Sequence, residues 1–211
     1  MQSRSYAVLI DAGFLKRKLG SREKPLNADD VRDFVDRLTA VPDLADHRLH
    51  RVYFYDAPPL KSQQEKPLAG GSVEFGNTAL ARNNQRLHQE LRGVPFVALR
   101  MGDLRFRGWT LDTRQLPPDK PHFQISADDL RPNVNQKGVD MRIGLDIASL
   151  TLKKHVDIIV LVTGDSDFVP AMKFARREGA QLFLVPLGSK VTDDVREHCD
   201  VMLDMPAVSE G

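Results

Sequence analysis

A short apolar segment at residues 156–163 restricts the fold of this chain more than any other feature. It reads Val-Asp-Ile-Ile-Val-Leu-Val-Thr, which has the length and the β-branched composition of a strand. Similar short strands alternate with amphipathic helices along the chain, and this alternation is typical of βαβ units around a mainly parallel sheet. Gly164, Asp165 and Asp167 follow the segment directly, so they should lie in the crevice beyond the strand's carboxyl end, where open α/β sheets bind ligands.

The remaining elements follow from periodicity and from helix and turn signals. We expect strands at 6–10, 51–56, 95–101, 181–185 and 201–203, and helices at 27–38, 78–91, 139–152, 167–178 and 192–198. Asn27 is the expected cap of the first of these helices. Residues 102–136 are harder to assign. Their alternating stretch 104–109 suits one strand of a hairpin, and we expect the segment to be an insertion beside the functional site.

Length and composition set wider bounds. A chain of 211 residues can bury a sizeable core, and we expect residues 1–211 to form a single domain. Thirty basic and 29 acidic residues leave a net charge of +1, so the overall charge indicates neither nucleic acid nor membrane as a partner. Cys199 is the single cysteine, which fits a reducing compartment, and we expect a cytoplasmic protein. No run approaches the roughly 18 apolar residues of a membrane span.

Aspartates follow more than one predicted strand. Asp11 comes directly after the first strand, and Asp165 and Asp167 follow the strand expected to lie beside it in a doubly wound sheet. Asp140 begins the apolar helix that leads into that second strand, where it either joins the acidic group or only complements the helix dipole. Asp146 lies farther along the same helix, and we expect it at the edge of the site or in a buried polar contact.

Clustered carboxylates repel one another unless they take up protons or bind a cation. Oxygen ligands of this kind suit Mg²⁺ or Mn²⁺, whereas zinc recruits histidine or cysteine. The histidines, at positions 47, 50, 88, 122, 155 and 198, show no ligand spacing. A pair of Mg²⁺ or Mn²⁺ ions on such carboxylates is a recurrent means of hydrolysing phosphodiesters with an activated water.

Other enzyme classes account for the aspartates less well. Asp165-Ser166-Asp167 has the Asp-x-Asp form of an aspartyl-phosphate phosphatase nucleophile, but only 44 residues follow it, too few for the partner groups of such an enzyme. Walker and Gly-x-Gly-x-x-Gly loops are absent from the sequence. Ser166 lacks the Gly-x-Ser-x-Gly context of a hydrolase nucleophile.

Basic residues are available for an anionic substrate. Lys137 and Arg142 flank Asp140 in the sequence, and Lys190 follows the strand at 181–185. The segment at 100–109 interleaves cations with an aromatic residue, which suits a single RNA strand whose bases stack while its phosphates are held. The residues are Arg100, Arg105, Arg107 and Trp109. A hairpin with a packed core and exposed arginines explains the same residues.

Three segments together resemble a known family. They are Ile10-Asp11-Ala12-Gly13-Phe14, then Lys137-Gly138-Val139-Asp140 with Asp146, and then Thr163-Gly164-Asp165-Ser166-Asp167-Phe168-Val169-Pro170. In order and context they resemble the NYN domain family of the PIN-like nuclease superfamily, and the resemblance spans about residues 5–204. Many members of that family carry Asn a few residues after the first Asp, where this chain has Gly13 and Phe14. The departure concerns one polar contact beside the metal site.

The resemblance implies a Rossmann-like three-layer sandwich with a central, mainly parallel sheet and metal-dependent endoribonuclease activity. Asp11, Asp140, Asp165 and Asp167 match the acidic positions of the family, with Thr163, Ser166 and Asp146 as residues that support them. We expect RNA as the substrate and products with 5′-phosphate and 3′-hydroxyl ends. The sequence allows either a monomer or a homo-oligomer. The alternatives are an inactive module of the same fold that binds RNA or protein, and a small-molecule phosphohydrolase.

Overall fold

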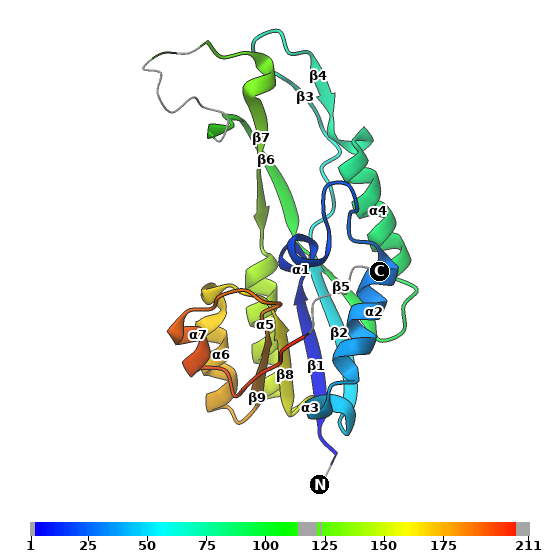
Figure 1. Ribbon diagram of the computed structural model, residues 1–211, viewed down its shortest axis with the longest axis vertical. Helices are drawn as coiled ribbons and strands as arrows, with labels where there is room; N and C mark the ends of the chain where they lie inside the picture. Colours follow the sequence, from blue (N-terminus) through cyan, green and yellow to red (C-terminus); the bar gives the residue numbers. More distant parts are fainter. Residues whose placement is uncertain (1–2, 114–121, 123, 206–211) are drawn as a thin grey trace.

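The computed structural model describes residues 3–113, 122 and 124–205, and its centre is a six-stranded sheet (Figure 1). All neighbouring strands run parallel, in the order β10-β9-β8-β1-β2-β5. The strands are β1 (Ser5–Asp11), β2 (Arg48–Asp56), β5 (Val97–Met101), β8 (Ile158–Val162), β9 (Gln181–Val185) and β10 (Val201–Met202). The predicted α/β class and parallel sheet are therefore confirmed.

Helices cover both faces of the sheet and make three layers (Figure 1). Along β1, Tyr6, Val8 and Ile10 pack into one core, while Ala7 and Leu9 pack into the other, because successive strand residues point to opposite faces. The first core includes residues of α1 (Ala12–Leu19), α2 (Ala28–Thr39), α3 (Pro42–Ala45) and α4 (Ala79–Leu91), and the second includes residues of α5 (Val139–Leu152), α6 (Val169–Arg177) and α7 (Asp193–Glu197). In the part of the chain that the structure describes, no helix is long and apolar enough to cross a membrane.

The direction in which successive strands are added to the sheet reverses between β1 and β8. From β1 the chain builds outward through β2 to β5, and from β8 it builds the other way through β9 to β10. β1 and β8 are direct neighbours, with Ile10 opposite Val162 in the register. A reversal of this kind leaves a crevice at the carboxyl ends of the two strands. Asp11 and Asp165 stand at those ends, as the sequence predicted.

Local signals account for most helix starts, and two helices, α1 and α3, were missed. The Asn27 side chain accepts hydrogen bonds from the backbone N–H groups of Asp29 and Asp30, which confirms the predicted cap of α2. α1 was not predicted, because Gly13 in its first turn has a poor helix propensity. The predicted helix at 167–178 begins instead as a 3₁₀ turn, η4 (Ser166–Phe168), before α6.

The segment after β5 rises from the sheet as a separate arm (Figure 1). β6 (Asp103–Leu111) and β7 (Leu130–Lys137) pair antiparallel in a sheet of their own, with Arg105 opposite Asn135. Beside them lie β3 (Gln63–Glu65) and β4 (Ser72–Glu74), which form a hairpin where no strand was predicted, and the 3₁₀ turn η1 (Phe75–Asn77). The predicted hairpin strand at 104–109 is confirmed. Residues 114–121 and 123 of the expected insertion lie outside the described residues.

Candidate active site

Asp11 joins β1 to α1 and is held by the first turn of that helix. It is the N-cap residue, and its Oδ1 accepts a hydrogen bond of 3.2 Å from the backbone N–H of Phe14. Burial raises the pKa of Asp11, and the charge of Asp140 adds to the increase, although Arg17 and the helix N–H groups oppose it. A half-buried carboxylate whose pKa is raised by another carboxylate is a candidate cation ligand.

The loop after β8 presents Asp165 and Asp167 in a fixed turn. The buried Thr163 hydroxyl accepts a hydrogen bond of 3.2 Å from the N–H of Asp165, and Asp165 Oδ1 accepts one of 2.9 Å from the N–H of Asp167. Gly164 is enclosed, since an added Cβ would lie 3.0 Å from Phe14 and 3.2 Å from Ser189. Three strand-end loops therefore meet at this glycine.

Asp140 brings a further carboxylate to the same edge of the sheet. It lies in the first turn of α5, which Gly138 starts in the left-handed conformation with φ of 77°. Burial raises the pKa of Asp140, and the negative charges of Asp165 and Asp167 raise it further. The predicted acidic residues thus interact electrostatically across three loops: Asp11 with Asp140, and Asp140 with Asp165 and Asp167.

The donor set of these four residues fits a hard divalent cation. All its donors are carboxylate oxygens, which suit Mg²⁺ or Mn²⁺. No three of these four carboxylates have ligand atoms that all lie within 4.8 Å of one another. Among the described residues, Asp194, Glu197 and His198 are the one group of three metal-binding side chains whose ligand atoms all lie within 4.8 Å of one another.

That second group lies on the short helix α7, and sequence reasoning missed it. Asp194 and Glu197 are exposed, and Asp194 forms ion pairs of 3.3 Å with Lys173 and with His198. The i,i+4 spacing of Asp194 and His198 was the available signal. Exposed acidic groups on a helix are common without a metal, and the charge of Asp194 is already compensated by Lys173.

Asp146 belongs to a separate polar contact of α5. It accepts a hydrogen bond of 2.8 Å from the Tyr55 hydroxyl and pairs with Arg100 Nε at 3.0 Å. Arg100 also lies 5.0 Å from the centre of the Tyr53 ring. Burial, with the nearby charge of Asp146, raises the pKa of Tyr55 above its ordinary range. This contact between α5 and the sheet matches the buried polar contact that we expected as one of two roles for Asp146.

The predicted cations lie around the acidic residues and along the arm. Lys137, Lys190, Arg105 and Arg107 are exposed, and none of them has an ion-pair partner among the residues that the structure describes. Arg142 is half-buried, and its Nη1 donates a hydrogen bond of 2.9 Å to the carbonyl of Gly138. Ser166 is exposed in the turn between the two aspartates.

A buried charged cluster beside the site was also missed. Asp56, at the carboxyl end of β2, is 5% exposed and accepts hydrogen bonds from Lys16 at 2.5 Å and from His88 at 2.6 Å. Burial alone would raise the pKa of Asp56, but the His88 and Lys16 contacts together hold it below its ordinary value. Its position as the last residue of the predicted strand 51–56 was a signal close to the one that identified Asp11, which directly follows a predicted strand.

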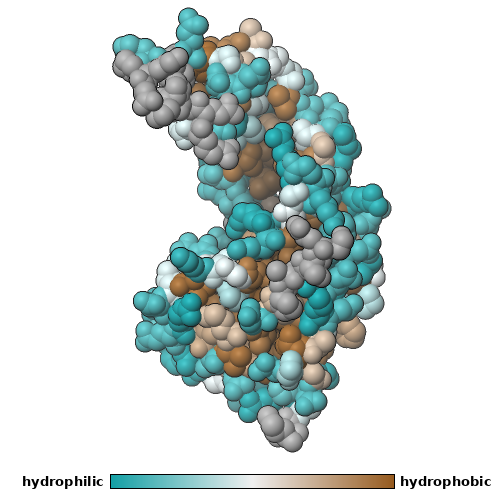
Figure 2. All heavy atoms as spheres, viewed as in Figure 1, coloured by the Kyte–Doolittle hydropathy of each residue, from teal (hydrophilic) through white to brown (hydrophobic). Residues whose placement is uncertain are grey.

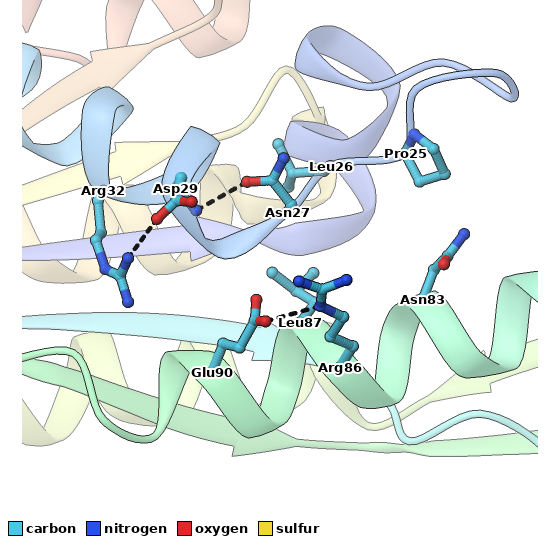
Figure 3. Close-up of a pocket in the computed structure, with 9 residues that line it drawn as sticks. All are labelled: Pro25, Leu26, Asn27, Asp29, Arg32, Asn83, Arg86, Leu87 and Glu90. Atoms are coloured by element: carbon cyan, nitrogen blue, oxygen red, sulfur yellow. Dashed lines mark hydrogen bonds and ion pairs between the residues drawn. The ribbon is translucent and has the colours of Figure 1, made fainter.

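A further pocket lies away from these residues (Figure 3). It is a cavity of about 390 Å³ between the segment that enters α2 and the exposed side of α4. Its cations are already neutralised, because Arg86 pairs with Glu90 at 2.8 Å and Arg32 pairs with Asp29. We therefore assign it no part in the candidate site.

The three-layer parallel sheet and the carboxylates at its switch point define a protein of the PIN-like nuclease superfamily. Residues 5–206 match the family model of the NYN domain, and the chain therefore belongs to the NYN family. The uncharacterized protein MJ0482 of Methanocaldococcus jannaschii is 27% identical over 71 residues, which are 34% of this chain and 30% of the length of that relative.

A solved structure agrees with the fold. The crystal structure of VPA0982, a protein of unknown function from Vibrio parahaemolyticus, matches with a TM-score of 0.54 at 16% identity. The match covers 96% of this chain and 95% of that one. At this level of identity the likeness supports the shared fold and nothing finer.

Proposed function

We propose that this protein is an endoribonuclease that uses Mg²⁺ or Mn²⁺ held by Asp11, Asp140, Asp165 and Asp167. The observation that carries the proposal is the electrostatic interaction of these carboxylates at the switch point of the sheet. Folding places like charges together at a cost, and a bound cation removes that cost. Membership of the NYN family supports RNA as the substrate.

The residues of the chain prepare this site before any ion binds. The Phe14 N–H holds one oxygen of Asp11, and the Asp167 N–H holds one oxygen of Asp165. The hydrogen bond to Asp165 reaches its Oδ1 atom, and both carboxylates carry further oxygen lone pairs that can accept a cation. When bound, the divalent ions supply an activated water and neutralise charge on the phosphate.

Cations around the carboxylates would bind the substrate. Lys137 and Lys190 are exposed and have no ion-pair partner among the described residues, and Arg142 lies near the start of α5. An acidic site attracts an RNA phosphate only when cations surround it. We assign these three residues to the phosphates nearest the cut, and we assign Thr163 and Ser166 to the turn that presents Asp165.

A nuclease assay with matched variants tests the proposal. The protein is incubated with end-labelled RNA and Mn²⁺, and the product ends are identified. Asp165→Asn and Asp140→Asn should each lower the rate by about 100-fold or more while circular dichroism shows a folded protein. The control is Asp194→Asn, which removes a carboxylate from the other possible metal group and should keep the wild-type rate.

The same variants separate the alternatives. Loss of activity only in Asp194→Asn would move the metal to α7 and overturn the assignment. Mn²⁺ binding by calorimetry without RNA cleavage would indicate an inactive binding module. Hydrolysis of phosphate monoesters or nucleotides without RNA cleavage would indicate a small-molecule phosphohydrolase. Cleavage that gives 5′-phosphate and 3′-hydroxyl ends supports the water mechanism.

A further inference from the structure

The arm has two chemically different faces. Arg105, Arg107, Asn133, Asn135 and Lys137 form what we call the polar face, and all five are exposed. Arg105 lies directly opposite Asn135, so the two side chains share one side of the hairpin. Asp103, opposite Lys137, is the one acidic member of this side among the paired residues of β6 and β7.

The other face of the arm carries the aromatic residues. Phe106 lies with its ring centre 5.5 Å from that of Phe75 and 5.7 Å from that of Trp109. The Trp109 indole N–H donates a hydrogen bond of 2.8 Å to the Glu65 carbonyl, and the Lys66 ammonium lies 5.9 Å from the Trp109 ring centre. The aromatic side chains therefore fasten the arm to the β3–β4 hairpin and η1.

A bulge produces this separation. Strict strand alternation would place Arg105, Arg107 and Trp109 on one face. The pairing shifts between Phe106 and Trp109, where Gly108 adopts a φ of 99° that favours glycine. The extra residue turns Trp109 to the side of Phe106, and Arg105 and Arg107 keep a face without aromatic rings.

The arm is joined to the acidic site through the chain itself, because β7 leads directly into α5. β7 ends at Lys137, and Gly138 and α5 with Asp140 follow at once. At the other strand, the Gly102 N–H donates a hydrogen bond of 2.7 Å to the Asp56 carbonyl. By strand geometry the backbone of Asn135 lies about 7 Å beyond Lys137, and that of Asn133 about 13 Å beyond it. The polar face thus extends outward from the carboxylates.

The surface beside the arm is concave. Figure 2 shows the molecule hollowed on one side between the arm and the body that contains the sheet. In Figure 1 the β3–β4 hairpin lies on the opposite side of β6 and β7 from this hollow. Because the aromatic face packs against η1 and β3, the polar face is turned away from them.

We propose that the polar face holds the sugar–phosphate backbone of double-stranded RNA and delivers an adjoining phosphate to the carboxylates. This inference rests on the proposed function and names its substrate class. Binding of single strands relies on exposed aromatic side chains that stack on bases. The arm instead offers guanidinium, ammonium and amide groups, which donate hydrogen bonds to phosphate and 2′-hydroxyl oxygens. Duplex RNA is recognised chiefly through those groups.

Binding measured without turnover tests the inference. Fluorescence anisotropy in EDTA measures the affinity for an RNA duplex of about 20 base pairs, which is the size of site that duplex-binding modules cover. The same assay is run with one of its strands and with a DNA duplex of the same sequence. We expect the RNA duplex to bind at least about tenfold more tightly than either competitor. Arg105→Ala/Arg107→Ala should weaken duplex binding by about tenfold or more and lower the salt slope by about 1.5–2, because two phosphate contacts are lost.

The matched control is Arg48→Ala/Arg51→Ala. It removes the same charge from exposed arginines near the start of β2, at the amino edge of the sheet, and should leave binding within about twofold of wild type. Asn135→Asp places a negative charge on the polar face and should also weaken duplex binding, which keeps the test valid if the double variant is unstable. Tighter binding of the single strand, or equal binding by the arm variant and wild type, would overturn the inference.

Failure of the inference and failure of the proposed function give different results. If duplex binding depends on the arm but the protein does not cleave RNA with Mn²⁺, the inference about the arm stands and the proposed nuclease activity is refuted. Cleavage of single-stranded RNA at a rate that does not depend on Arg105 and Arg107 keeps the nuclease and refutes the inference.

Discussion

Replacing Asp56 with asparagine should strongly destabilise the protein. The carboxylate is almost fully buried and compensates the ammonium of Lys16, which is itself 24% exposed at its side chain. Removing one partner of a buried ion pair costs about 3–5 kcal/mol, because the other charge stays uncompensated. The amide still accepts a hydrogen bond and Lys16 is partly solvated, so we expect a loss of about 2–3 kcal/mol. For a chain of this size that is about 5–10 °C in Tm.

Thermal unfolding followed by circular dichroism measures the change, with urea unfolding as a second measure. The control is Asp128→Asn, which breaks the ion pair of an exposed aspartate with Lys66 at 3.6 Å. A solvent-exposed pair of this kind contributes about 0.5 kcal/mol or less. If Asp56→Asn and Asp128→Asn lowered Tm equally, the ion pair at Asp56 would not stabilise the fold as we infer.

The pH dependence gives an independent check on Asp56. Its native pKa lies below the ordinary value, so ionised Asp56 stabilises the folded state above the ordinary aspartate pKa of about 3.9. That stabilisation is lost as pH falls through the lower native pKa. The difference in unfolding free energy between wild type and Asp56→Asn should therefore shrink below about pH 4. A difference that stayed constant into that range would contradict the assigned shift.

Three further predictions concern the acidic site and the arm. Asp140→Asn should raise the Tm of the metal-free protein, since it removes like-charge repulsion, and should weaken Mn²⁺ binding by calorimetry; a lower Tm would refute the repulsion. Because the pKa values of Asp11 and Asp140 are raised, Mn²⁺ affinity should begin to fall at a pH above that at which ordinary aspartates protonate, as a calorimetric pH series would show. Gly102→Ala should cost about 1–3 kcal/mol in urea unfolding, because its Cβ would lie 2.7 Å from the Lys137 carbonyl oxygen, and an unchanged midpoint would contradict this close approach.

Much of the fold could be predicted from the sequence alone. The apolar strands and amphipathic helices are local patterns, and strand alternation with helices defines a parallel three-layer sheet. Asn27 caps its helix as its residue type predicts. The aspartates at strand ends could also be located, because a parallel sheet places the carboxyl ends of its strands at one edge. Their roles as metal ligands stay a prediction.

Other features depend on residues that are distant in the sequence. Asp56 also lies at the end of a predicted strand, but it differs from Asp11 because Lys16 and His88, from two different helices, enclose it. A pattern of single residues does not contain that contact. The electrostatic interaction of Asp140 with Asp165 likewise exists only because the start of α5 folds back beside the end of β8.

The arm shows most clearly which features follow from the sequence and which depend on the tertiary structure. Its alternating sequence predicted one strand of a hairpin, with arginines and a tryptophan at every second position from 105 to 109. Whether Trp109 shares that face depends on the pairing register of β6 and β7 and on the positive φ of Gly108. The sequence by itself therefore determined the sheet, its order of strands and helices, and the acidic strand ends, because these follow from local periodicity. Only the tertiary structure decided which side chains share the polar face of the arm, because a bulge of one residue reverses the direction of those that follow it.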